Sequence, residues 1–174
     1  LIPAFKTSIN VDIMMGYFSS NSFKEIADGL ATFLNATSGK IRLVISPFLT
    51  TEDNLISSMS EVELRDFVQN TIFNVEEGAD HIVDYCLACF GWMLSEKRLE
   101  IKIATLDEGI FHTKVWLFND GHNICALHGS MNQTKRGIKR NVENLTLSRP
   151  WISEERSSEV LELTEFFNEV FDNN

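Results

Sequence analysis

The sequence predicts a single α/β domain in which a mixed β-sheet has helices on both faces. With 174 residues, 44% of them hydrophobic and 23% charged, the chain can fold around one core without disulfides or metals. In its first half, strand-like and helix-like patterns alternate, which is typical of parallel strands joined by helical crossovers. In its second half, strand patterns follow one another across short turns, which is typical of antiparallel strands. Together the two halves predict a mixed sheet.

The first half begins with a strand and a helix. Residues 8–20 carry an apolar strand pattern that runs into a Gly- and Ser-containing loop. Residues 22–36 place apolar side chains at helical spacing, and Ser22 is the candidate N-cap. Gly39 ends this helix, and the β-branched residues 40–46 predict a second strand that stops before a proline.

Two helices are predicted in the middle of the chain, after a polar and irregular segment at residues 48–60. Ser60 begins the first of them, and Glu63 stands three residues later, as a capping box requires. The second covers residues 80–94 and is apolar over most of its circumference. We therefore expect the second helix to be buried.

The second half supplies four strands and a final helix. Asn119, Asp120 and Gly121 are a strong hairpin-turn signal between the second and third of these strands. The predicted elements are strands at 99–106, 111–118 and 122–130, a basic loop at 131–141, a strand at 142–148 and an acidic amphipathic helix at 153–171.

Three cysteines, Cys86, Cys89 and Cys125, indicate neither a disulfide framework nor a metal centre. The C-x-x-C pair lies in an apolar helix pattern without partner ligands, which favours buried thiols. We therefore expect a reducing compartment, the cytoplasm. No run reaches the roughly 18 apolar residues of a membrane span, and the N-terminus lacks a signal-peptide pattern. Because the chain does not begin with Met, it could be a piece of a longer, multidomain protein.

Charge is unevenly distributed along the chain. The formal net charge is −10, which by itself argues against binding to nucleic acid. Residues 97–149, however, hold nine Lys and Arg residues against five Asp and Glu residues. The local field, not the net charge, governs attraction into a binding cleft. The acidic total therefore does not exclude an anionic ligand at this segment.

Five polar side chains in this basic segment form a candidate site. His112 and Lys114 alternate onto one face of the strand at 111–118, which on their own could be an ordinary solvated strand face. Ser130 and Asn132 follow Gly129 at the end of the next strand, and Glu143 begins the one after it. If these strands are neighbours, the five side chains meet at one end of the sheet. An imidazole nucleophile, cations or amides for phosphoryl oxygens and a carboxylate that orients the imidazole fit phosphodiester chemistry.

This pattern, H-x-K followed by G-S-x-N and a later Glu, resembles the half-motif of the phospholipase D superfamily, most of all its nuclease-type and restriction-endonuclease-like members. The order of the elements is also similar over most of the chain. The resemblance implies a phospholipase D-like half-domain over residues 1–174. It also implies roles for the candidate residues: His112 forms a covalent phosphohistidine, Lys114 and Asn132 bind phosphoryl oxygens, Ser130 supports them, and Glu143 orients the imidazole.

The same resemblance implies a homodimer. Family members use two histidines from two half-sites, whereas this chain holds one copy of the motif, so His112 would meet its symmetry mate across a two-fold axis. No metal or other cofactor is needed in that scheme. The chain departs from the family pattern H-x-K-x4-D at one position, where Asn119 stands in place of the Asp and Asp120 comes next.

Four cations follow the candidate site directly and have two interpretations. Lys135, Arg136, Lys139 and Arg140 could be a solvated surface, or they could contact the backbone of a polyanion at the rim of the site. Their position after Asn132 favours contact with DNA.

The sequence thus predicts a metal-independent phosphodiesterase that cleaves DNA in a site shared by two subunits, and that could be one module of a restriction or helicase-like protein. Two alternatives stay open. The first is a non-catalytic module of the same fold that binds DNA or dimerises. The second is a lipid phosphodiesterase or phosphatidyl transferase, although the sequence has neither an amphipathic anchor nor a basic membrane face.

Overall fold

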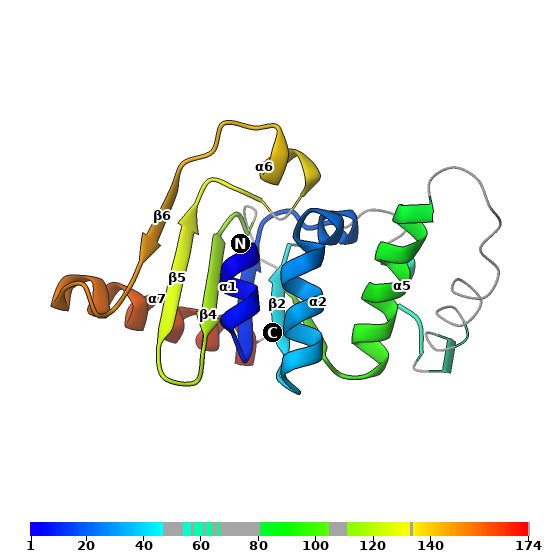
Figure 1. Cartoon of the computed structure of the whole chain (residues 1–174), viewed down its shortest axis with the longest axis horizontal. Coiled ribbons are helices and arrows are strands. Elements are labelled where there is room, and N and C mark those ends of the chain that lie inside the picture. Colours follow the sequence, from blue (N-terminus) through cyan, green and yellow to red (C-terminus); the bar gives the residue numbers. More distant parts are fainter. Residues whose placement is uncertain are drawn as a thin grey trace.

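The computed structural model describes residues 1–46, 54–56, 58–60, 62–63, 66, 81–104, 111–132 and 134–173. A six-stranded sheet in the order β3-β2-β1-β4-β5-β6 forms the centre of the described part of the chain (Figure 1). Its strands are β1 (Asn10–Met15), β2 (Ile41–Ile45), β3 (Leu99–Ile103), β4 (Lys114–Asn119), β5 (Ile124–Gly129) and β6 (Leu145–Ser148). The helices are α1 (Ile2–Thr7), η1 (Ser20–Ile26, a 3₁₀ helix), α2 (Ala27–Ala36), α5 (His81–Ser95), α6 (Lys135–Lys139) and α7 (Glu154–Asn173).

The sheet is mixed, as predicted. β1, β2 and β3 are parallel neighbours. η1 and α2 lie in the connection from β1 to β2, and α5 lies in the connection from β2 to β3. β4 pairs antiparallel with β1, β5 with β4, and β6 with β5. The interleaved first half therefore forms the parallel side of the sheet, and the hairpin-rich second half forms the antiparallel side.

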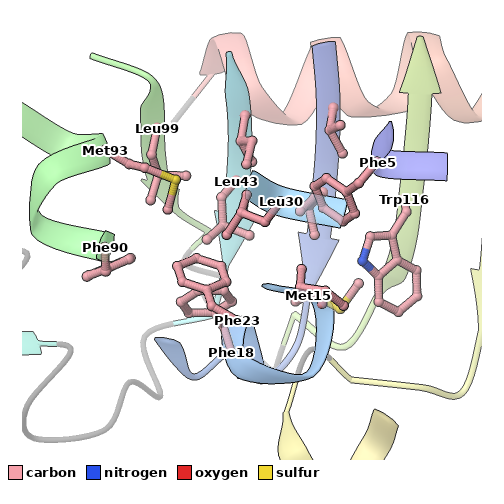
Figure 2. Close-up of a cluster of buried hydrophobic side chains, with 14 of the residues drawn as sticks. Phe5, Met15, Phe18, Phe23, Leu30, Leu43, Phe90, Met93, Leu99 and Trp116 are labelled. Carbon is pink, nitrogen blue, oxygen red and sulfur yellow. The ribbon is translucent and has the colours of Figure 1, made fainter. Parts of the chain in front are cut away.

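Helices cover both faces of the sheet and create two cores. On one face, α1, α2 and α5 pack over the strands, and Figure 2 shows Phe5, Leu30 and Phe90 from these helices gathered with Trp116 and Met15 from the sheet. The other face is covered by α7 alone among the described helices (Figure 1). There Val160, Phe167 and Phe171 pack on the apolar side chains of the central strands, Met14, Val44, Val115, Leu117 and Ala126. Burial on both sides explains why β1 and β2 read as nearly continuous apolar runs.

A polar cluster also fastens α7 to the sheet. The guanidinium of Arg42 donates two hydrogen bonds of 2.7 Å to the carboxylate of Asp12 and one of 3.1 Å to Oδ1 of Asn168. Cζ of Arg42, the central carbon of the guanidinium, lies 4.7 Å from the ring centroid of Phe167. The hydrogen bond and charge of Asp12 raise the pKa of Arg42 against the opposing effect of burial.

Several predicted boundaries need correction. β4 begins at Lys114, so residues 111–113 precede the strand although the alternation includes them. The helix predicted from residue 22 begins two residues earlier as η1, which puts the buried Ser22 inside the first turns and not at the N-cap. Glu143 lies two residues ahead of β6.

Two short helices were not predicted. α1 begins with a proline in its first turn, where the missing N–H has no helical partner to lose, and it buries Phe5. α6 interrupts the predicted basic loop, with Thr134 as its N-cap: Oγ1 of Thr134 accepts a hydrogen bond of 3.1 Å from the backbone N–H of Gly137. Both helices are too short for their apolar period to be visible in the sequence.

The predicted capping box is present at Ser60 and Glu63. The carboxylate of Glu63 accepts hydrogen bonds from the backbone N–H and from Oγ of Ser60, and these bonds lower the pKa of Glu63. Most of the helix predicted after Ser60, part of the irregular segment before it and the loop at 105–110 lie outside the described residues.

Candidate active site

The register of the strands brings the candidate residues to one edge of the sheet. Lys114 at the start of β4 pairs with Met15 at the end of β1, because these strands are antiparallel. Gly129 at the end of β5 pairs with Leu145 at the start of β6. Residues just before β4 and β6 and just after β1 and β5 therefore share this edge. His112, Lys114, Ser130, Asn132 and Glu143 are all found there, as the sequence predicted.

Lys114 is a nearly buried cation. Its side chain is part of a residue only 6% exposed, and Nζ donates a hydrogen bond of 2.7 Å to the backbone carbonyl of His112. Burial lowers the pKa of Lys114, while the negative charge of Glu143 acts in the opposite direction. Lys114 thus holds the backbone of the segment that carries His112.

His112 packs against Gly16, the residue that directly follows β1. A Cβ added at Gly16 would stand 3.1 Å from both Cα and Cδ2 of His112, so the glycine allows the two segments to lie in close contact. The ring of Tyr17 meets the imidazole at right angles, with 6.2 Å between the centroids. His112 itself is exposed, so its imidazole can reach a ligand at the edge of the sheet.

Ser130 and Glu143 form a hydrogen-bonded pair across the β5–β6 connection. Oγ of Ser130 donates to Oε2 of Glu143 and accepts a bond of 2.9 Å from the backbone N–H of Asn144. Nδ2 of Asn141 donates to Oε1 of Glu143 at 2.9 Å. The bonds from Ser130 and Asn141 lower the pKa of Glu143, and the charge of Lys114 contributes in the same direction. Glu143 is therefore held as a carboxylate whose two oxygens are both engaged.

The role assigned to Glu143 from the family resemblance, orientation of the imidazole, stays a prediction. Among the residues that the structure describes, its hydrogen bonds go to Ser130 and Asn141, and none joins it to His112 of the same chain. The structure instead connects Glu143 to Lys114 by charge and to Ser130 by a hydrogen bond.

Asn132 is fixed from both sides. Its Oδ1 accepts a hydrogen bond of 3.1 Å from the backbone N–H of Tyr17, which leaves the Nδ2 hydrogens as donors for a ligand. Its backbone carbonyl accepts from the N–H of Thr134 at 2.8 Å. A Cβ at Gly137 would stand 2.3 Å from that carbonyl oxygen, so only glycine lets α6 pack against Asn132.

Gly129 permits another close approach at the site. Its φ of +154° and a distance of 2.0 Å from a Cβ at this position to the carbonyl oxygen of Asn144 exclude any side chain. The structure shows that the close neighbour of this glycine is the chain ahead of β6. This contact places Ser130 beside Glu143.

The predicted DNA-binding cations lie on or next to α6. Arg136 and Arg140 are exposed, and Lys139 forms an ion pair of 3.1 Å with Glu25. The side chain of Lys135 lies outside the described residues. Their contact with DNA stays a prediction.

Asn119, at the family's usual Asp position, lies at the opposite end of β4 from His112. Its Oδ1 accepts a hydrogen bond of 2.7 Å from the N–H of Gly121, and Asp120 accepts from the backbone of His122 and Asn123. These bonds shape the β4–β5 turn. The departure from the family pattern thus affects a turn and leaves the edge with His112 intact.

Sequence reasoning missed Gly16, Tyr17 and Asn141 as parts of this edge. Tyr17 and Asn132 are 115 residues apart in the chain, and their hydrogen bond depends on the pairing of β1 with β4. The available signal was the aromatic residue directly after the first strand, which was assigned to a loop.

Metal ligands do not gather within the described residues, where no three His, Cys, Asp or Glu side chains form a suitable group. All three cysteines are free thiols. Burial, with a smaller effect of Cys86, raises the pKa of Cys89 to about 11, which keeps this thiol protonated.

Comparison with known proteins agrees with this geometry. A sequence model of the family described as "Cardiolipin synthase, PLD-like domain" matches residues 4–170. The chain belongs to this phospholipase D-like family. No curated protein sequence matches it. Within the described part of the chain, no helix has the length and apolar character needed to cross a membrane.

A solved structure, NucT, shows the same fold. NucT from Helicobacter pylori is similar with a TM-score of 0.59 and 12% sequence identity, over 98% of this chain and 84% of that one. The yeast tyrosyl-DNA phosphodiesterase is similar with a TM-score of 0.47 and 12% identity, over 82% of this chain and 25% of that one. The mixed sheet with helices on both faces is thus a phospholipase D-like fold.

Proposed function

We propose that this chain is a metal-independent phosphodiesterase that cleaves DNA through a covalent phosphohistidine, in a site shared by two subunits. The observation that carries the proposal is that one edge of the sheet holds the exposed His112, the buried Lys114, Asn132 and the Ser130–Glu143 pair. A nucleophile, donors for phosphoryl oxygens and a fixed carboxylate are thereby assembled at one place.

In the first step, a nitrogen of His112 attacks phosphorus and forms a P–N bond, while the bond from phosphorus to the leaving oxygen breaks with its electron pair. The ammonium of Lys114 and the amide hydrogens of Asn132 stabilise the non-bridging oxygens as their negative charge is redistributed. The leaving oxygen takes a proton from a second imidazole. In the second step, that imidazole removes a proton from water, which attacks phosphorus and breaks the P–N bond.

We propose that the second imidazole comes from another copy of the chain. His128 lies on β5 with Nε2 3.1 Å from a carboxylate oxygen of Glu159 on α7, and His122 lies in the β4–β5 turn at the opposite end of the strand. Neither is therefore placed to serve His112. A two-fold axis at this edge brings in a second His112 by symmetry.

DNA is the proposed substrate because a basic helix begins next to the phosphate site. Arg136 on α6 and Arg140 at its C-cap are exposed, and the N-cap residue Thr134 is hydrogen-bonded to Asn132. Cations in that position can neutralise the phosphates that flank the scissile one.

The test is cleavage of DNA in the presence of EDTA. Wild type is expected to cleave, and His112→Ala is expected to lose activity to background because no nucleophile remains. His122→Ala is the matched control, since that histidine lies in the β4–β5 turn, at the opposite end of β4 from His112. EDTA-resistant cleavage by His112→Ala at the wild-type rate contradicts the proposal. Trapping of a phosphate on His112 with a slow substrate, detected by mass spectrometry, would exclude a non-catalytic module.

A second candidate is a phospholipid diester as substrate, because the description of the matched family names cardiolipin synthase. The same chemistry at His112 applies to both diesters. Parallel assays with DNA and with phosphatidylglycerol vesicles distinguish them, and we expect turnover of DNA only.

A further inference from the structure

Tyr17 is an aromatic side chain that the mechanism above does not use. It follows Gly16 directly after β1 and is 41% exposed, although its neighbours Met15 and Phe18 are both buried. Its ring stands at 84° to the imidazole of His112 with 6.2 Å between the centroids. A large aromatic surface therefore reaches solvent immediately beside the proposed nucleophile.

The backbone that carries Tyr17 is held firmly. Its N–H donates to Oδ1 of Asn132 at 3.1 Å, and the carbonyl of the preceding Gly16 accepts a hydrogen bond from the buried hydroxyl of Ser46. Phe18 packs against Phe23 and Phe90 in the core. With its flanking residues anchored, Tyr17 projects its ring from a rigid base.

The backbone of Tyr17 is also hydrogen-bonded to Asn132, one of the proposed phosphate-binding residues. Asn132 is bound to the backbone of Tyr17 on one side and, through Thr134, to the start of α6 on the other. A diester whose phosphorus lies against His112 and whose non-bridging oxygen meets Asn132 thus has its sugar and base next to Tyr17. An exposed aromatic side chain beside a phosphate site is the arrangement with which proteins stack bases of single strands.

We propose that Tyr17 stacks on the nucleobase adjacent to the scissile phosphate, so that the site selects unpaired nucleotides. The inference rests on the proposed phosphodiesterase function and assigns its substrate class. In a duplex each base face is covered by its neighbours, so a base has to leave the stack to meet the ring. A lipid diester offers no such face.

The test compares single-stranded oligonucleotides that carry either normal bases or abasic sugars around one cleavable phosphate, with the duplex as a third substrate. In wild type we expect kcat/KM for the normal strand to exceed that for the abasic strand by roughly 5- to 150-fold, the range of one aromatic–base stack. The Tyr17→Leu variant should reduce this ratio to near one through a higher KM, and Tyr17→Phe and Tyr17→Trp should keep it. The matched control is Tyr85→Leu on α5, which removes a ring that is 49% exposed and should keep the wild-type ratio.

The outcomes separate the two claims. A wild-type ratio near one, or a wild-type ratio in a folded Tyr17→Leu variant, overturns the role of Tyr17 while leaving the nuclease activity in place. If wild type binds the strands in an anisotropy titration without cleaving them, the proposed catalysis fails and the same ratios are measured as Kd values, where a ratio near one again overturns the role. If wild type neither binds nor cleaves, both claims fall.

Discussion

At the scale of single residues, the site depends on a lysine that is kept out of solvent. Lys114 is held between the carbonyl of His112 and the charge of Glu143, and burial lowers its pKa. In the proposed mechanism, such a cation would have few water molecules to displace when a phosphoryl oxygen arrives, and its charge would be available to the transition state. The hydrogen bond from Nζ of Lys114 to the backbone carbonyl of His112 also keeps His112 in place.

The Ser130–Glu143 pair gives a pH-dependent prediction. Because hydrogen bonds from Ser130 and Asn141 lower the pKa of Glu143 in the folded chain, the pair contributes stability at pH values above the ordinary Glu pKa of about 4.3. This contribution is lost as the pH falls through the lowered pKa. We expect Glu143→Gln to have a lower Tm than wild type at pH 7, and we expect this difference in Tm to shrink as the pH falls below the ordinary Glu pKa, as measured by thermal unfolding.

The exposed Glu165→Gln on α7 is the control for this prediction, and its difference from wild type should not follow the same pH course. An equal loss of Tm in Glu143→Gln at both pH values would show that the side chain acts through its shape and not through its charge.

The sequence predicted the five candidate residues because each stands at a fixed offset from a strand. It could not predict Gly16, Tyr17 or Asn141, whose contacts join segments that are brought together only by the sheet. Nor could it show that Glu143 bonds to Ser130 and Asn141, since several partners were within reach of a carboxylate at that position.

At the scale of elements, glycines set the distances between the strand ends. Gly16 lies against His112, Gly129 against Asn144 and Gly137 against Asn132. In each case the close neighbour includes backbone atoms, which cannot rotate away as a side chain can. Three pairs of segments therefore lie in close contact at this edge of the sheet, because no Cβ atom of these glycines stands between them.

Replacement of Gly129 should separate β5 from the chain ahead of β6. In Gly129→Ala the new Cβ would stand 2.0 Å from the carbonyl oxygen of Asn144, at a φ of +154°. We expect a loss of about 2 kcal/mol or more in the free energy of unfolding, together with lower kcat as Ser130 moves from Glu143. Denaturant titration and steady-state kinetics measure the two effects.

Gly121→Ala is the matched control for the steric part. Its φ of +94° also disfavours a side chain, but a Cβ there would meet only the side chain of Ile9 at 3.1 Å. A loss in Gly129→Ala no larger than in Gly121→Ala would mean that the contact with Asn144 is unimportant.

Element types followed well from sequence patterns, whereas several ends did not. The alternation at 111–118 extends ahead of β4, because Phe111 is buried and His112 is exposed. The pairing with β1 nevertheless stops at Lys114, whose partner Met15 is the last residue of β1. Strand ends are determined by the neighbouring strand, and a single sequence does not contain that information.

At the scale of the whole molecule, an ion pair between β1 and β2 holds Arg42 in contact with α7. Arg42 and Asp12 keep only 30% and 15% of their side-chain surfaces exposed, and Arg42 also contacts Asn168 and the ring of Phe167 on α7. In Asp12→Ala the guanidinium would remain half-buried without its carboxylate. We expect this change to lower the free energy of unfolding by about 1–2 kcal/mol, measured by denaturant titration.

The exposed pair of Lys6 and Asp28 provides the comparison. Its members are 39% and 70% exposed, so Asp28→Ala should change stability by less than about 0.5 kcal/mol. Equal effects of the two variants would argue against a role for Arg42 in docking α7.

The overall architecture was the most predictable level, because the alternation of patterns along the chain reports which strands can be parallel. The net charge of −10 was the least informative. Seven of the 25 acidic residues lie in α7, on the face opposite α1 and α2, while the edge with His112 carries Lys114 and adjoins α6 (Figure 1). An average over the chain conceals this separation.

The central claim is that one active site takes His112 from each of two chains. Wild type and His112→Ala can be unfolded together, refolded at varying ratios and assayed for DNA cleavage in EDTA. If each site needs both histidines, activity per total protein should fall with the square of the wild-type fraction, to about one quarter in an equal mixture. A linear fall, to about one half, would show that each chain acts alone and would contradict the shared site.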